Sequence, residues 1–318
     1  NDGSKDSPFI TIQKGIDSAL SGDTIRVGAN TFSTPMLSYG YSEKITITDK
    51  NLTLLSDSGA DSTKIDGGGT GRPVTITGSS AVTMKGFSIT NGLAENGGGV
   101  NISSTGGVIL ENLYIYSNQA TDNGGGVFIS ENSAITTINS CKIYNNVCVD
   151  SGGGIENQDS TIVQNTLIYN NEAQTDGGGI FAADVLILTN STLAYNFTND
   201  GRYGPAIDIG AGLDSLLLLN NIFYHNYSGN SFSDGEGGIY IWDGRLVAYN
   251  NYFQSGDNNL NISRGSGNIF SDVDPFGIVQ DETLITINNH FTLSDSSSAN
   301  GTGISSVTLN GTTYTAPS

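Results

Sequence analysis

Basic side chains are scarce in this sequence. Its 318 residues hold 12 Lys and Arg against 31 Asp and Glu, which gives a formal net charge of −19 at pH 7. A field of this sign repels nucleic acid and anionic lipid. We therefore expect no nucleic-acid partner. The excess of acid indicates either a coat that keeps the protein soluble or a surface that attracts cations, Ca²⁺ in particular.

Cysteines and long apolar runs are also lacking. Cys141 and Cys148 are the two cysteines, and their spacing fits no metal-ligand pattern. They could form a disulfide within one repeat or stay as two buried free thiols. No apolar run reaches the ~20 residues that a membrane-spanning helix needs, and no signal peptide is recognisable. We expect no membrane span, and we expect the chain to be a fragment of a longer surface protein.

Glycine, in contrast, recurs in a fixed pattern. Triplets begin at Gly97, Gly124, Gly152 and Gly177, and each runs into an apolar, β-prone segment. "YGPAI" at Gly204 and "EGGIY" at Gly237 continue the series. Glycine is favoured where the backbone needs a positive φ or approaches another chain segment closely. The spacing of about 27 residues indicates a solenoid or a propeller.

A second motif keeps step with the triplets, in "ENLYIYSN", "NSCKIYNN", "QNTLIYNN", "TNSTLAYN" and "LNNIFYHN". Aligning these segments produces two columns of mostly asparagine. The first contains Asn112, Ser140, Asn165, Asn190 and Asn220, and the second contains Asn118, Asn146, Asn171, Asn196 and Asn226. Asparagine tolerates left-handed turns, and its amide can bond to equivalent amides above and below. Both columns are therefore interpreted as structural ladders.

These repeats predict an all-β parallel β-helix. Each repeat of about 27 residues contains short β-prone pieces such as "GVFIS", "AITTINS" and "KIYNN". Three such strands per coil would build three short sheets, with successive coils stacked about 4.8 Å apart. A propeller blade would need about 40 residues and four longer strands, so the propeller ranks lower.

The ends of the chain are less regular. Residues 7–20 predict an amphipathic helix that caps the stack, with Ser7 as its N-cap and Pro8 in its first turn. Its apolar face would contain Phe9, Ile12, Ile16, Ala19 and Leu20. We expect a single domain over residues 1–318, in which 23–255 form the coils and 256–318 form irregular last turns and a closing segment.

Several segments resemble one known group of proteins. "NDGSKDSPFITIQKGIDSALSGDTIRVGANTF" and "KIDGGGTGRPVTI" resemble the N-terminal region of right-handed parallel β-helix proteins of the pectin-lyase-like superfamily. Within this superfamily they are similar to secreted bacterial proteins that carry a choice of C-terminal anchors. The segment "FTLSDSSSANGTG" resembles the closing segment of those proteins. The repeats also resemble those of chlamydial polymorphic outer-membrane proteins. The resemblance implies a right-handed coil and an extracellular or bacterial cell-surface location.

That superfamily contains lyases, hydrolases, epimerases and adhesins, so the fold leaves the function open. Its lyases use a Lys, Arg or His base, yet residues 86–201 contain one basic side chain, Lys142, and no histidine. We therefore favour a non-enzymatic module for adhesion, matrix structure or glycan binding. Its partner would be a polysaccharide or a glycan on a host or neighbouring cell. The alternative is a lyase or glycoside hydrolase of acidic polysaccharide.

An active or binding site would lie in the irregular repeats between residues 198 and 250. The candidate catalytic residues there are His225, Arg202, Arg245, Asp208 and Asp243. The candidate ligand-binding residues are Trp242, Tyr203, Tyr227, Asp234 and Glu236. An indole can stack on a sugar ring, and paired acids can hydrolyse a glycosidic bond. Polar inserts that serve solubility are the other interpretation.

An acid also precedes each regular triplet, namely Glu95, Asp122, Asp150 and Asp176. If these positions stack, like charges repel by about 1 kcal/mol per contact in water. A shared Ca²⁺ ion would remove that cost, using hard oxygen ligands. Acids that fan outward into solvent are the alternative. Ca²⁺ is thus the one cofactor that the sequence suggests.

Overall fold

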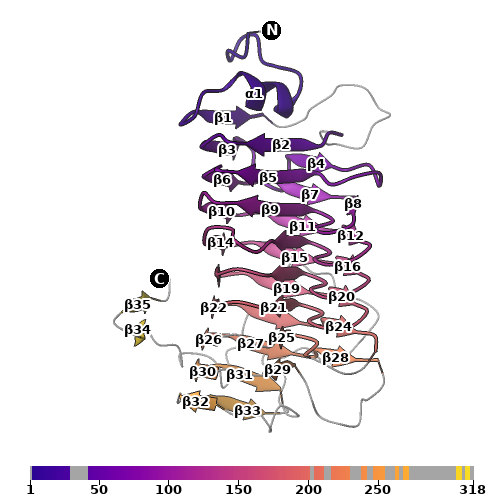
Figure 1. Ribbon diagram of the computed structural model, residues 1–318, viewed down its shortest axis with the longest axis vertical. Helices are drawn as coiled ribbons and strands as arrows, with labels where there is room; N and C mark the ends of the chain where they lie inside the picture. Colours follow the sequence, from indigo (N-terminus) through magenta and orange to yellow (C-terminus); the bar gives the residue numbers. More distant parts are fainter. Residues whose placement is uncertain are drawn as a thin grey trace.

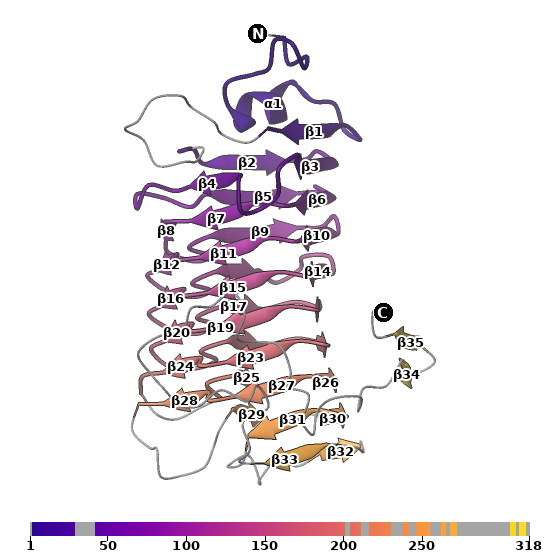
Figure 2. The ribbon, with the colours of Figure 1, turned by 180° about the vertical axis from the view of Figure 1, so that it is seen from behind.

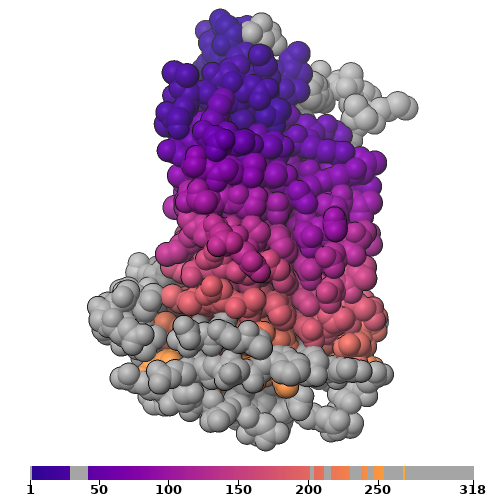
Figure 3. All heavy atoms as spheres, viewed as in Figure 1, coloured from indigo at the N-terminus to yellow at the C-terminus, as the bar shows by residue number. Residues whose placement is uncertain are grey.

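The computed structural model describes residues 2–28, 42–200, 204–210, 216–229, 238–241, 246–254, 262–264, 268–271, 306–309 and 312–315. In these residues the chain winds into stacked coils of short parallel strands, which confirms the predicted β-helix (Figure 1). In the space-filling view the sequence colours follow one another down the stack, so neighbouring surface comes from neighbouring coils (Figure 3). No helix in the described part of the chain has both the length and the apolarity to cross a membrane.

The described strands of the coils form four parallel sheets, one more than predicted. The ten-strand sheet contains β1 (Thr24–Val27), β3 (Leu52–Ser56), β6 (Val82–Lys85), β10 (Val108–Glu111), β14 (Thr136–Asn139), β18 (Thr161–Gln164), β22 (Leu186–Thr189), β26 (Leu216–Leu219), β30 (Leu246–Tyr249) and β32 (Ile262–Arg264). The nine-strand sheet contains β4 (Lys64–Asp66), β7 (Ser88–Thr90), β11 (Tyr114–Tyr116), β15 (Lys142–Tyr144), β19 (Leu167–Tyr169), β23 (Thr192–Ala194), β27 (Ile222–Tyr224), β31 (Tyr252–Gln254) and β33 (Ile269–Ser271).

The eight-strand sheet contains β2 (Ile45–Thr48), β5 (Val74–Gly78), β9 (Val100–Ser104), β13 (Val127–Ile129), β17 (Ile155–Asn157), β21 (Ile180–Ala182), β25 (Ile207–Ile209) and β29 (Ile239–Ile241). The six-strand sheet contains β8 (Leu93–Ala94), β12 (Gln119–Ala120), β16 (Val147–Cys148), β20 (Glu172–Ala173), β24 (Phe197–Thr198) and β28 (Tyr227–Ser228). It runs as a narrow column along one edge (Figures 1 and 2). Two-residue strands are too short to show an alternating pattern in the sequence, which is why this sheet was not expected. Beyond the coils, β34 (Ser306–Leu309) pairs antiparallel with β35 (Thr312–Thr315).

The register of the eight-strand sheet follows the glycine triplets. Val127 pairs with Val100 on one side and with Ile155 on the other, and Ile180 pairs with Ile155 and Ile207. Each of these residues directly follows a third glycine or its equivalent. The predicted alignment of repeats is therefore confirmed.

The predicted cap helix is shorter than expected. Helix α1 covers Ile12–Ser18, with Thr11 rather than Ser7 as its N-cap. Its start depends on a distant side chain, because the Glu43 carboxylate accepts the N–H groups of Ile12 and Gln13 at 2.7 and 3.0 Å. Ser7 instead pairs with Ser4 in an isolated bridge, and Leu20 is 75 % exposed rather than on the buried face.

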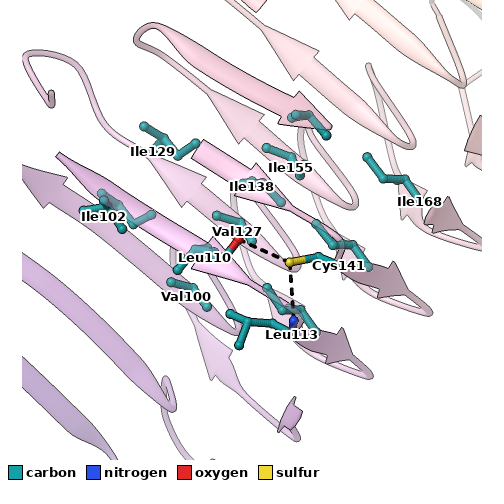
Figure 4. Close-up of a cluster of buried hydrophobic side chains, with 14 of the residues drawn as sticks. Val100, Ile102, Leu110, Leu113, Val127, Ile129, Ile138, Cys141, Ile155 and Ile168 are labelled. Carbon is teal, nitrogen blue, oxygen red and sulfur yellow. Dashed lines mark hydrogen bonds between the residues drawn. The ribbon is translucent and has the colours of Figure 1, made fainter. Parts of the chain in front are cut away.

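A continuous apolar core fills the coils. Along β10, Val108 and Leu110 are buried whereas Ile109 between them is 41 % exposed. Ile12 and Ile16 of α1 join the same core, so the helix covers its N-terminal end. Figure 4 shows side chains from successive coils meeting inside, where Cys141 lies beside Leu110 and Leu113. Such close packing makes each coil stabilise its neighbours.

The two predicted asparagine columns have separate roles. Asn112, Ser140, Asn165, Asn190 and Asn220 adopt left-handed conformations with φ between 48° and 56°. The second column is buried, and its amides form a ladder: Nδ2 of Asn118, Asn146, Asn171 and Asn196 each donates to Oδ1 of the next member at 2.9–3.0 Å. In this second turn the left-handed residue is the one before the asparagine, such as Asn145 or Asn170.

Cys141 belongs to a third column that the sequence did not reveal. Its sulfur accepts the N–H of Leu113 at 3.4 Å, and its own N–H donates to Oγ1 of Thr166 at 3.3 Å. Asn221 and Asn251 continue this column with an amide bond of 3.0 Å. Both cysteines are buried and free, so the disulfide alternative does not hold. Burial raises the pKa of Cys141 to about 12.

The glycine triplets fit around the asparagine ladder. Gly124, first in its triplet, has a φ of 66°, which L side chains rarely adopt. At Gly126, the third, an added Cβ would lie 2.5 Å from the Gly154 carbonyl oxygen and 3.0 Å from Nδ2 of Asn146. The triplet therefore supplies the left-handed turn and leaves room for the amide ladder beside it.

Candidate functional site

The outer face of the eight-strand sheet carries a column in which aromatic and carboxyl side chains alternate. The residues on either side of its members, such as Ile207 and Ile209, belong to the core, so the middle residue of each strand points outward. The registers align these middle residues coil by coil. This aromatic–carboxyl column consists of Phe128, Glu156, Phe181, Asp208 and Tyr240.

The two carboxyl groups of the column are buried and poorly hydrogen-bonded. Glu156 is 2 % exposed and Asp208 is 0 % exposed. Oε1 of Glu156 accepts a bond from Nε2 of Gln158 at 3.3 Å. Within the described part of the chain, no group bonds to its Oε2 or to either carboxyl oxygen of Asp208. Buried polar atoms without partners are rare in folded proteins because desolvation is costly, so this pair is a candidate for a functional site.

The surroundings keep both carboxyl groups protonated near neutral pH. The pKa of Glu156 is raised to about 8, mainly by burial and less by the charges of Asp150, Asp122 and Asp176, while the bond from Gln158 opposes the rise. Burial, followed by the charge of Asp176, raises the pKa of Asp208 to about 8. A protonated carboxyl can donate a hydrogen bond to a ligand as well as accept one.

The acids that precede the glycines border this column. The Asp122 N–H donates to the Glu95 carbonyl at 2.9 Å, and the Asp150 N–H donates to the Asp122 carbonyl at 3.0 Å. The next rung of that stack is Thr175, whose Oγ1 donates to the Asp150 carboxylate at 2.7 Å. The expected four-acid stack thus holds for three acids.

Asp176 lies one position further along the chain, level with Ser151, because Thr175 takes the position equivalent to Asp150 in a segment of equal length. The N–H of Gly152, which follows Ser151, donates to the Asp176 carbonyl at 3.0 Å. Among the described residues, no three His, Cys, Asp or Glu side chains group as a metal site would require. Calcium on the acid stack stays a prediction.

The structure places the described catalytic and binding candidates on different sheets. Asp208 lies in the aromatic–carboxyl column. His225 has a left-handed φ of 49° in the turn between β27 and β28, and its ring stacks on Tyr195 at 5.4 Å. Tyr227 of β28 is 41 % exposed, with its ring 4.9 Å from that of Phe197. The left-handed backbone and the ring stacking give His225 a structural role in this turn.

The remaining sequence candidates lie outside the described residues. They are Arg202, Tyr203, Asp234, Glu236, Trp242, Asp243 and Arg245.

Sequence reasoning missed Phe128, Glu156 and Phe181. A signal was present, because each is the second residue after a glycine triplet, in "GGGVF", "GGGIE" and "GGGIF". Reading that position down the repeats would have found the column.

A second aromatic feature lies on the nine-strand sheet. Tyr116, Tyr144 and Tyr169 stack with ring centroids 4.9 and 4.8 Å apart. The Nζ atom of Lys142 lies 4.6 Å from the centroid of the Tyr114 ring on the same sheet. The one basic side chain between residues 86 and 201 is therefore held on a different sheet from the aromatic–carboxyl column.

Comparison with known proteins agrees with this architecture. No curated protein and no solved structure matches the chain. A family model described as "Right handed beta helix region" matches residues 57–245, which is more than half of the chain. The match covers the glycine triplets, the asparagine ladder and the whole aromatic–carboxyl column, and it agrees with the predicted right-handed coil. The chain belongs to the right-handed β-helix family.

Proposed function

We propose that this chain is a non-enzymatic, glycan-binding β-helix module of an extracellular or bacterial cell-surface protein, and that it binds through the aromatic–carboxyl column. The observation that carries the proposal is the pair of buried carboxyl groups, Glu156 and Asp208, on either side of Phe181. Sugars present apolar ring faces beside hydroxyl groups, and aromatic rings next to carboxyl groups complement both. The resemblance to secreted bacterial β-helix proteins supports the location.

The chemistry of the face argues against a lyase. A lyase needs a base for the proton next to a uronate carboxylate and positive charge to neutralise that carboxylate. The eight strands of this sheet contain no Lys, Arg or His in their sequences. An acidic polysaccharide would also be repelled by the acids beside the column, namely Asp122, Asp150 and Asp176.

A glycoside hydrolase is the second candidate, because of the spacing of the carboxyl groups. Glu156 and Asp208 lie two coils apart, about 9.6 Å between backbones at the usual strand spacing. Inverting hydrolases place their two carboxyl groups about 6.5–9.5 Å apart. Such enzymes need one protonated and one ionised group, yet the pKa of both carboxyl groups is raised to about 8. Binding therefore accounts for the pair better than hydrolysis.

The test is binding of the purified chain to a panel of neutral, acidic and amine-bearing glycans, with a parallel assay for reducing ends. Phe181→Ala should weaken binding about tenfold, because it removes the ring between the carboxyl groups. Phe197→Ala is the matched control, since Phe197 lies on the six-strand sheet. Absence of binding to every glycan would contradict the proposal. Release of reducing ends that stops in Glu156→Gln would favour the hydrolase.

A further inference from the structure

We propose that the aromatic–carboxyl column selects glycans that carry free amines, such as chains of deacetylated amino sugars. This inference rests on the proposed glycan-binding function and names the ligand class. It starts from the sign of the charge. Glu156 and Asp208 are the inner groups; Asp122, Asp150 and Asp176 lie near Glu156, and Asp176 also lies near Asp208. Every ionisable group of this set is an acid.

Positive charge from the described part of the protein does not balance the inner pair. The ion pairs formed between described residues are Arg26–Asp57 and Lys85–Glu111, and neither includes an acid of this face. The Lys142 ammonium lies over the Tyr114 ring on the nine-strand sheet. The buried oxygens of Glu156 and Asp208 therefore have unused hydrogen-bond acceptor positions, which a ligand would reach once the groups that bury them move aside.

An ammonium group suits these positions better than a metal ion. Phe181 lies between the two carboxyl groups of the column. The described residues also contain no group of three side chains that could hold a metal ion. A primary ammonium needs one carboxylate and benefits from an aromatic face within about 6 Å. Phe128 and Phe181 supply such rings on either side of Glu156. The alternation of ring and acid along the axis would then match amines repeated along a sugar chain.

Proton exchange accompanies this binding. When an ammonium group binds beside protonated Glu156, the carboxyl group releases its proton to solvent. The resulting carboxylate then pairs with the ammonium, and the net charge of the two groups is zero. Among the described residues, Asp122, Asp150, Asp176, Gln158 and the Cys148 thiol interact with Glu156, and Asp176 interacts with Asp208. The neighbouring acids favour a cation close to Glu156 and Asp208. Binding of an ammonium should therefore release protons from these two groups at pH values where, without ligand, they are still protonated.

The experiment compares glucosamine and N-acetylglucosamine oligosaccharides of equal length by calorimetry at about pH 6. These ligands share the same sugar backbone and differ in the charged amine. The amine form should bind at least about tenfold more tightly, and its affinity should fall with added salt. Measuring the heat in two buffers with different ionisation enthalpies should reveal proton release with the amine form alone.

Variants locate the effect. Glu156→Gln and Asp208→Asn keep the side-chain shapes, and each should reduce the preference for the amine form to less than about threefold and remove part of the proton release. Glu131→Gln is the charge-matched control, since Glu131 is an exposed acid in the turn after β13. Equal binding of both oligosaccharides would overturn the amine inference and leave glycan binding intact. A preference that survives in both variants would overturn the assignment to this face. Failure of the whole glycan panel would overturn the proposed function itself.

Discussion

Nδ2 of Asn146 donates to Oδ1 of Asn171 at 3.0 Å, and the same oxygen accepts the backbone N–H of Asn146 at 3.1 Å. Asn171 in turn donates through its own Nδ2 to the carbonyl of Ile143, one coil away. One buried amide thus satisfies three polar groups of the preceding coil. The repeat is held together at this turn by polar contacts as well as by the apolar core.

Asn171→Ala should lower the free energy of unfolding by about 3 kcal/mol, because it leaves two buried donors and one buried acceptor without partners. Urea unfolding followed by circular dichroism measures the change. Asn165→Gly is the matched control, since Asn165 is an exposed left-handed residue whose conformation glycine adopts freely. An equal loss in both variants would contradict the special role of the buried ladder.

Gly126→Ala should destabilise the protein by several kcal/mol, because the new Cβ would lie 2.5 Å from a carbonyl oxygen of the next coil. The expected result is a melting temperature lowered by several degrees. Gly107→Ala serves as control, since the nearest atom to its added Cβ lies 3.8 Å away. If Gly126→Ala has the same melting temperature as the wild type, the coils can separate locally to admit the Cβ, and the prediction is wrong.

The stability of the protein should fall as the pH rises from about 4 to about 8. The folded-state pKa values of Glu156 and Asp208 are raised to about 8, above their ordinary values of 4.5 and 3.8. The unfolded chain therefore ionises first as the pH rises, and stability is lost until the folded groups also ionise. At about 1.4 kcal/mol per pKa unit, each group contributes on the order of 5 kcal/mol.

Urea midpoints measured at about pH 5 and pH 8 check this pH dependence. Glu156→Gln and Asp208→Asn should each flatten the profile, because amides do not titrate. Glu131→Gln should leave it unchanged, as this side chain is exposed. A protein that becomes more stable between these two pH values would contradict the protonated state of the buried pair.

Calcium is the remaining prediction from the acid stack of Glu95, Asp122 and Asp150. If the stacked carboxylates share the ion, millimolar Ca²⁺ should raise the melting temperature, and EDTA should reverse the rise. Asp122→Asn should remove the effect, because Asp122 is the middle rung of the stack. A melting temperature unchanged by Ca²⁺ would eliminate a site on this stack.

Much of the architecture follows from the repeat alone. The alignment of Gly97, Gly124, Gly152 and Gly177 predicted which residues pair across coils, and Val127 indeed pairs with Val100 and Ile155. The asparagine columns were likewise visible as columns. Both could be predicted because a solenoid stacks equivalent positions, so one spacing in the sequence determines every contact between coils.

Other features depended on contacts that no local pattern contains. Helix α1 begins at Ile12 because Glu43 reaches its first N–H groups, and Lys50 Nζ donates to the carbonyls of Ile16 and Ala19 at the other end. Glu156 is buried because two coils bring Phe128 and Phe181 beside it, so an ordinary acid becomes a protonated one. The sequence by itself determined which positions stack, since backbone pairing repeats with the chain. Only the tertiary structure decided the burial and charge environment of each side chain, because these depend on neighbours from other coils.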